Sequence, residues 1–184
     1  MVLEILYYAK SRELQYETIA VAEMTGNVVT TLTPLAQKHG IEFLVSIAPD
    51  LGTIEVDPQW MEAALINFLE NAVDACLFDR DKKDHQVSFT VEKKSTTDIC
   101  FRIQDNGIGM DAETRNKMFT LFFTSKGSQG TGLGLFIAHR VIKYHGGTVH
   151  VESTPGDGSQ FTICIPFKKP ENARILGNPG KDKG

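Results

Sequence analysis

The sequence of 184 residues has few cysteines and no long apolar run. Cys76, Cys100 and Cys164 are odd in number and far apart, so they form neither a zinc-binding spacing nor a disulfide ladder. We therefore expect buried free thiols in a reducing compartment. No hydrophobic stretch is long enough to cross a bilayer, and the first residues show no signal-peptide pattern. The expected location is cytoplasmic, although the parent protein can still be attached to a membrane.

An excess of positive charge is also absent. The 23 acidic residues outnumber the 19 lysines and arginines, which gives a net charge of −4. A protein held to nucleic acid by phosphate contacts usually has the opposite balance, so no nucleic-acid partner is expected. Hydrophobic residues make up 41% and charged residues 23%, as in an ordinary soluble domain with a real core.

Apolar periodicity predicts a mixture of helices and strands. The expected helices are 2–18, 21–39, 58–78, 111–119 and 131–144, and the expected strands are 41–48, 86–93, 98–104, 148–153 and 159–167. Pro34 should kink the second helix or mark a new first turn, and Asp57 with Pro58 is a strong start for the third. The order of elements predicts an α+β fold with helices on one face of a mixed sheet. From Pro170 onward the composition predicts a disordered tail.

The third predicted helix carries an unusual polar stripe. Asn67, Asn71 and Asp74 recur at positions i, i+4 and i+7, opposite the apolar side. Amide oxygens are suitable ligands for Mg²⁺ beside phosphates. Taken alone, however, a simple solvated stripe is the better interpretation.

Two glycine-rich segments follow. In the segment 105–110, Asp105 ends a strand and can accept a hydrogen bond from an amine such as that of adenine, while Gly107 and Gly109 permit close approach of a flat ligand. A plain Asn-Gly turn is the alternative. The segment 130–135 opens a helix, whose backbone N–H groups favour a bound anion. A flexible loop is the alternative there, and we favour phosphate binding.

Two further segments complete the set. Residues 119–129 mix phenylalanines with polar residues, which suggests either a hinged lid or an anchored surface loop, and Lys126 can reach a terminal phosphate. In the segment 156–162, Phe161 points to the core, so Thr162 lies on the other face and can join the adenine hydrogen bonds, unless this is an ordinary hairpin strand.

In order, these segments resemble the motifs of the histidine-kinase ATPases, which share the Bergerat fold with gyrase B, heat-shock chaperones and mismatch-repair ATPases. Residues 67–75 resemble the N box, 121–126 the F box, and the three glycine segments the glycine boxes. The resemblance covers about residues 41–168 and implies a two-layer α/β sandwich. With seven residues between Thr124 and Gly132, the lid looks short, as in kinases of the nitrogen-regulation type.

The resemblance implies that ATP and Mg²⁺ are bound, with Asn71 as the metal ligand and Asn67, Asn71 and Lys126 as the catalytic candidates. The residues expected to contact the nucleotide are Asn67, Asn71, Asp74, Asp105, Gly107, Gly109, Met110, Phe122, Lys126, Gly130, Thr131, Gly132, Leu133, Gly134 and Thr162.

Two departures from the wider family refine this expectation. Hydrolytic relatives carry a glutamate where Asn67 stands, and an amide cannot act as a general base. Transfer of phosphate to a protein is therefore favoured over hydrolysis. Many kinases carry a basic residue at the position of Asp74, so Asp74 is expected to orient its neighbours instead of contacting phosphate.

None of the five histidines lies in the phosphoacceptor motif of such kinases. We expect residues 1–20 to be the remaining second helix of the dimerisation and phosphoacceptor hairpin, 21–168 the catalytic domain and 169–184 a tail. The implied partners are that hairpin domain, in a parent that can be a homodimer, and the receiver domain of a response regulator. The alternatives are a non-catalytic nucleotide-binding module, a hydrolytic ATPase of the chaperone kind and, more narrowly, an anti-sigma-type serine kinase.

Overall fold

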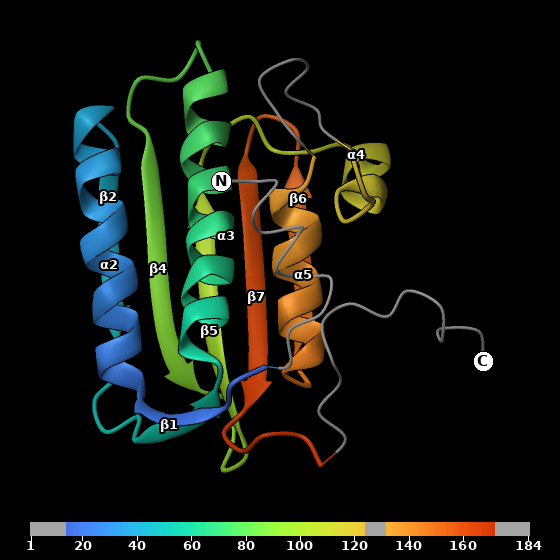
Figure 1. The fold of residues 1–184 in the computed structure, drawn as a ribbon. Helices are drawn as coiled ribbons and strands as arrows, with labels where there is room; N and C mark the ends of the chain where they lie inside the picture. The colour runs from blue at the N-terminus through green and yellow to red at the C-terminus, as the bar shows by residue number, and fades with distance from the viewer. Residues whose placement is uncertain (1–13, 124–131, 172–184) are drawn as a thin grey trace.

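Three long helices lie side by side on one face of a sheet in the computed structural model, which describes residues 14–123 and 132–171 (Figure 1). These helices are α2 (Val21–Lys38), α3 (Pro58–Phe78) and α5 (Gly134–Tyr144), and the short α4 (Ala112–Lys117) lies near α5. The arrangement is the two-layer α+β sandwich that the sequence predicted, with the opposite face of the sheet left without helices among the described residues.

The main sheet has five strands in the order β2-β4-β5-β7-β6. Their bounds are β2 (Glu42–Ile47), β4 (Gln86–Lys93), β5 (Asp98–Asp105), β6 (Thr148–Thr154) and β7 (Gly158–Pro166). β2 pairs with β4 in parallel, and the other neighbours are antiparallel. The sheet is therefore mixed, with β5 and β7 at its centre beneath α3 and α5.

The core lies between the helix layer and the sheet. Alternate residues of β5, such as Phe101 and Ile103, are fully buried against the helices, as expected when one face of a strand is covered. Phe68 of α3 is also fully buried, and its ring lies 5.4 Å from that of Phe161 on β7. The α3 apolar stripe predicted from sequence is thus the central packing surface.

Helix α3 begins where the sequence indicated. The Asp57 carboxylate accepts a hydrogen bond from the Trp60 N–H (3.2 Å), and Pro58 occupies the first turn. Helix α2, in contrast, continues through Pro34 to Lys38 with no new start. The interior proline removes one backbone hydrogen bond, but buried residues on both sides of it, Leu32 and Ala36, keep the helix on the core.

The segment that leads into α2 differs from the prediction. Within the expected helix 2–18, residues 1–13 lie outside the described part of the chain, and residues 14–16 have no regular structure. Strand β1 (Glu17–Ala20) follows and pairs antiparallel with β3 (Thr53–Val56), a strand that the sequence reading missed. Tertiary pairing has overridden the helical spacing here, because Ile54 and Val56 are buried and need a partner strand.

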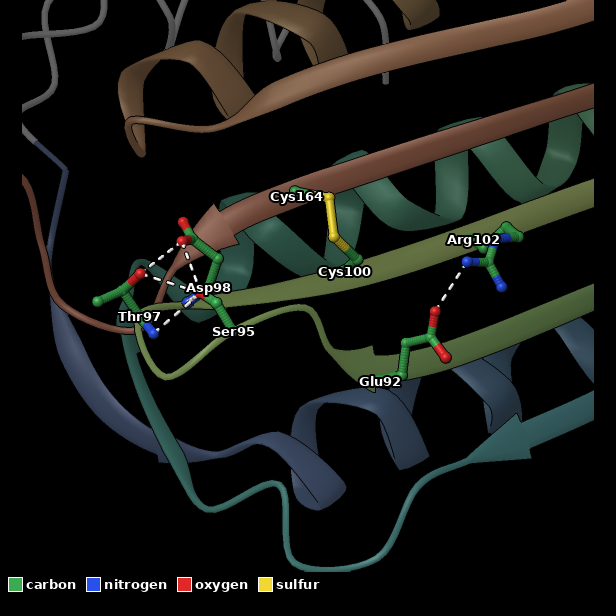
Figure 2. Close-up of a disulfide and its surroundings, with 7 residues drawn as sticks. All are labelled: Glu92, Ser95, Thr97, Asp98, Cys100, Arg102 and Cys164. Atoms are coloured by element: carbon green, nitrogen blue, oxygen red, sulfur yellow. Dashed lines mark hydrogen bonds and ion pairs between the residues drawn. A yellow bond between two sulfur atoms is a disulfide. The ribbon is translucent and has the colours of Figure 1, made fainter.

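The expectation of three free thiols is wrong. Cys100 of β5 and Cys164 of β7 are register partners and form a disulfide, while Cys76 remains a buried thiol. Figure 2 shows the bond on the face of the sheet turned away from α3, near the Arg102–Glu92 ion pair. The 64 residues that separate the two cysteines in sequence hid this pairing, which only the strand register reveals.

Replacing Cys164 with serine should remove the effect of reductant on stability. For a closed loop of this length, the chain-entropy estimate is a loss of about 4 kcal/mol when the bond is broken. We expect denaturant unfolding of the native chain to shift to lower denaturant with dithiothreitol, and that of Cys164→Ser to be insensitive to it. The matched Cys76→Ala variant should keep the shift. Equal behaviour of native chain and Cys164→Ser under oxidising conditions would contradict the bond.

Candidate functional site

The polar stripe of α3 is half-buried and ordered by the helix itself. The Nδ2 group of Asn67 donates to the Ala63 carbonyl (2.9 Å), and that of Asn71 donates to the Asn67 carbonyl (2.7 Å). These bonds set the planes of both amides. Asp74 lies on the same half-buried stripe. A solvated stripe would be exposed, so these side chains belong to a partly enclosed surface.

One end of this stripe meets the start of α5. A Cβ on Gly134 would lie 2.6 Å from the Oδ1 atom of Asn67, closer than real contacts allow. Gly134 therefore faces the Asn67 side chain where the two helices meet, and residues 67–75 and the segment 130–135 come together there. The buried side chain of Leu133, just before the helix, fixes this junction to the core.

Asp105 lies at the other end of the stripe. Its carboxylate is buried at the end of β5 and accepts hydrogen bonds from the backbone N–H groups of Gly107 (2.9 Å) and Ser159. Burial raises the pKa of this carboxyl to about 6, and these two hydrogen bonds and the charge of Lys82 only partly oppose that rise. A buried acceptor with so perturbed a pKa is typical of a binding site.

The glycines of the segment 105–110 are required by contacts within the protein. A Cβ on Gly107 would overlap the backbone of Ala75 in α3, and the neighbouring Ile108 N–H donates to the Ala75 carbonyl (3.1 Å). Gly109 has a φ of +65° and lies against the Thr154 carbonyl. The structure thus gives these glycines a role that the sequence reading missed: they let the loop after β5 dock directly on α3 and on the turn after β6.

These contacts arrange the site along one helix face. Asn67 meets Gly134, Asn71 follows one turn later, and Ala75 meets Gly107 after one further turn. At a rise of 1.5 Å per residue, the first and last of these positions are about 12 Å apart. The amide stripe, the strand-end carboxylate and the glycine-opened helix therefore share one surface.

The described residues on either side of the predicted lid are joined. The Phe122 N–H donates to the Gly132 carbonyl (3.1 Å), and Gly132 has a φ of +64°. Phe122 itself has a φ of 63°, rare for a residue with a side chain, and 67% of its surface is exposed. Lys126, Gly130 and Thr131 lie outside the described residues. Helix α5 begins at Gly134, three residues later than predicted, so Gly132 precedes the helix.

Thr162 lies away from this surface. It is the register partner of Arg102 and His150 on the open face of the sheet, whereas Asp105 is on the face toward α3. The predicted site is corrected accordingly, because the sheet separates Thr162 from Asp105. The residue beside Asp105 is Ser159, its register partner.

Sequence reasoning missed Ser159 and the hydroxyl network around it. Ser159 Oγ lies 2.9 Å from Ser153 Oγ, which in turn accepts a hydrogen bond from the Met110 N–H (2.8 Å). The sequence held a signal for this, because Ser159 has the same strand parity as the buried Phe161 and faces the same way.

A second missed group fixes the loop after α3. The side chain of Asn106 accepts from the Gln86 N–H (2.8 Å) and donates to the Asp84 carbonyl (2.8 Å). Lys82 donates to the Asn106 carbonyl (2.6 Å) and brings a positive charge near Asp105. An Asn directly after the strand-end Asp is the sequence feature that would have indicated these side-chain hydrogen bonds.

The donor set bears on which cation the site can hold. Across residues 14–123 and 132–171, no cluster of three or more His, Cys, Asp or Glu side chains is suited to a metal. The Asn71 amide places a hard oxygen donor on the half-buried stripe, a ligand type that Mg²⁺ accepts. No helix in the same described residues is long and apolar enough to span a membrane.

Replacing Asp105 with asparagine should stabilise the domain at neutral pH. The folded pKa of about 6 exceeds the ordinary aspartate value of 3.8, so ionisation of this carboxyl opposes folding. Stability is full below about pH 4 and is lost as the pH rises through 6, by roughly 3 kcal/mol in total. Asparagine keeps an acceptor oxygen without the charge. Denaturant unfolding should show Asp105→Asn more stable than the native chain at pH 7 and equal to it at pH 4.

Asp111 provides the matched control for this measurement. Hydrogen bonds from Thr114 lower the pKa of this exposed N-cap carboxyl, and asparagine caps a helix equally well, so Asp111→Asn should not gain stability at pH 7. A neutral or destabilising effect of Asp105→Asn at pH 7, with no dependence on pH between 4 and 7, would contradict the burial argument.

Comparison with known proteins agrees with this geometry. Residues 56–169 match the family described as "Histidine kinase-, DNA gyrase B-, and HSP90-like ATPase". The chain is 28% identical over 175 residues to the signal transduction histidine-protein kinase AtoS of Escherichia coli, which covers 95% of this chain and 28% of AtoS. It is 29% identical over 166 residues to the sensor histidine kinase ZraS of Klebsiella oxytoca, covering 90% of this chain and 35% of ZraS. The chain thus spans about a third of these relatives.

Solved structures show the same fold. The nucleotide-free catalytic domain of the histidine kinase ThkA superposes with a TM-score of 0.72 at 26% identity, covering 84% of this chain and 97% of that domain. Full-length ShkA in complex with AMPPNP gives a TM-score of 0.77 at 25% identity, covering 95% of this chain and 36% of ShkA. The chain therefore belongs to the histidine kinase-, DNA gyrase B- and HSP90-like ATPase family, as the ATP-binding catalytic domain of a sensor histidine kinase.

Proposed function

We propose that this domain binds Mg²⁺-ATP along the half-buried polar face of α3 and transfers the γ-phosphate to a histidine on a separate domain. The observation that carries the proposal is the single surface on which Asn67, Asn71 and Asp105 meet Gly134 and Gly107. The order along the helix supports adenine at the Asp105 end, the metal near Asn71 and the terminal phosphate near Asn67.

Each end of this surface suits the group assigned to it. The Asp105 carboxylate is fixed by two backbone N–H groups and can accept a hydrogen bond from the exocyclic amine of adenine. At the other end, the backbone before α5 offers N–H groups at a helix start, where anions are favoured. Gly132 and Leu133 would contact phosphate there, together with Lys126, Gly130 and Thr131.

Mg²⁺, when bound, would neutralise charge on the phosphates and help to hold them for in-line attack. The side chain assigned to it is that of Asn71, whose amide plane is set by its bond to the Asn67 carbonyl. The remaining ligands would come from the phosphates and water. The contribution of the protein is then mainly positioning and electrostatic stabilisation.

Asn67 favours transfer over hydrolysis. Its Nδ2 group donates to the Ala63 carbonyl, and its Oδ1 atom lies against Gly134, so the side chain is held at the phosphate end of the surface. An amide cannot remove a proton from water. Glu70, three residues further along the helix, is exposed and about 60° away from the helix position of Asn67. The proposed nucleophile is therefore a histidine brought from outside the domain.

The comparisons support a place in two-component signalling. ThkA has been solved in complex with the response regulator protein TrrA, and that kinase superposes on this chain with a TM-score of 0.73 at 26% identity. We infer that a receiver domain accepts the phosphate after the histidine. We also infer that the segment ending near residue 20 follows a dimerisation and phosphoacceptor domain, in a parent that acts as a homodimer and can be attached to a membrane.

Removing the Asn71 amide should weaken binding of Mg²⁺-ATP by at least tenfold, because both the metal ligand and its orientation are lost. Calorimetric titration of Asn71→Ala with the Mg²⁺ complex of a non-hydrolysable ATP analogue measures this. Binding of ADP without metal should change little in this variant. Asn27→Ala, on the exposed side of α2, is the matched control. Unchanged affinity for the Mg²⁺ complex in Asn71→Ala would refute the assignment.

Phosphate transfer is tested by adding the missing acceptor. A separate hairpin domain that carries the phosphoacceptor histidine should become labelled from γ-labelled ATP when mixed with this chain, and the chain alone should show almost no ATP turnover. Steady hydrolysis by the chain alone would instead indicate a hydrolytic ATPase. Nucleotide binding without labelling of the acceptor would indicate a binding module.

A further inference from the structure

A buried histidine lies at the end of the molecule remote from the nucleotide surface. His145, directly after α5, is only 2% exposed. Its Nε2 atom accepts a hydrogen bond from the Asp57 backbone N–H (3.0 Å), and its Nδ1 group lies 2.8 Å from the Val141 carbonyl. Because a backbone N–H can only donate, Nε2 carries no proton and Nδ1–H is the donor to Val141. Burial lowers the pKa of the ring and agrees with this neutral form.

The segment that leads into the domain is attached at the same point. The Asp57 carboxylate accepts a hydrogen bond from the Gln15 N–H (2.8 Å). The ring of Tyr16 lies 5.3 Å from that of His145, and its hydroxyl donates to the Tyr144 carbonyl (3.1 Å). Burial raises the pKa of Tyr16 to about 12, so this hydroxyl stays a donor. Residue 15 therefore contacts Asp57, whose backbone N–H bonds to the imidazole, and the ring of residue 16 packs against the imidazole itself.

The two helices joined by His145 are those that carry the site. α3 starts at Pro58 and α5 ends at Tyr144, and they lie side by side (Figure 1). At the start of α5, Gly134 meets Asn67 in the middle of α3. From Asp57 to Asn67 the distance along α3 is about 15 Å at 1.5 Å per residue. Helix α5 thus contacts α3 at both of its ends, through the imidazole after its last residue and at Asn67 beside its first.

We propose that His145 is a positioning residue that acts through Asp57 and Tyr16 to hold the linker, defined as residues 14–16, on the paired helices α3 and α5. The linker then moves with the nucleotide site as one body, and loss of the imidazole hydrogen bonds releases it while the sheet stays folded. The inference rests on the proposed function in one respect. The proposed function places a phosphoacceptor domain before the linker, and this joint would transmit the orientation of that domain.

Hydrogen exchange followed by mass spectrometry on the whole chain tests the joint. His145→Phe keeps a ring against Tyr16 but removes both imidazole hydrogen bonds, so amide exchange in residues 15 and 16 should rise about tenfold or more, with β1, β4 and β5 unchanged. His145→Gln can accept from Asp57 and donate to Val141, and it should restore most of the protection. If His145 only supported the overall stability of the domain, His145→Gln would not restore amide protection selectively in the linker.

Two controls separate this from general destabilisation and from the proposed function. Val91→Ala removes buried methyl groups from β4 and should accelerate linker exchange no more than sheet exchange. The joint is refuted if His145→Phe behaves like Val91→Ala, leaves the linker unchanged, or is not rescued by glutamine. The proposed function is tested independently by calorimetric titration of Asn71→Ala with the Mg²⁺-ATP analogue, because that variant leaves the linker contacts in place.

Discussion

Helix α3 has to satisfy two environments at once, and the rest of the molecule is arranged around that requirement. One of its faces is buried against the sheet through Phe68 and its apolar neighbours. The opposite face carries two amides that bond within the helix, so it remains half-buried without a hydrophobic cover. Asp57 at its start, Asn67 in its middle and Ala75 near its end each contact a different distant segment, so displacing this helix would disturb all of them together.

Close backbone approach makes these contacts possible. Gly107 allows the loop after β5 to reach the backbone of α3 at a distance that any side chain would block, and Gly134 lies against the Asn67 side chain. The same packing buries the Asp105 carboxylate and raises its pKa, which costs folding free energy. A carboxylate kept in such a place at the expense of stability is expected where it serves a ligand. Fold and site are therefore built from the same contacts.

Much of this was predictable from local sequence. The strands 86–93 and 98–105, the capped start of α3 and the turn before β7 follow from alternation, an N-cap and turn residues within a few positions of one another. The motif order identified the family because it depends on spacing along the chain. The pairing of β1 with β3 and the continuation of α2 through Pro34 did not follow, because burial against distant residues outweighs local propensity there.

The sequence by itself determined which residues could form a nucleotide site: the amides at i and i+4, the strand-end Asp105 and the glycine-opened helix. Tertiary structure alone decided which of them meet. Strand register brought Cys100 to Cys164 and set Ser159, not Thr162, beside Asp105, and helix packing buried His145 against Asp57. The physical reason is sequence separation: register and helix contacts join residues tens of positions apart, and no local pattern encodes which distant partner a given face will find.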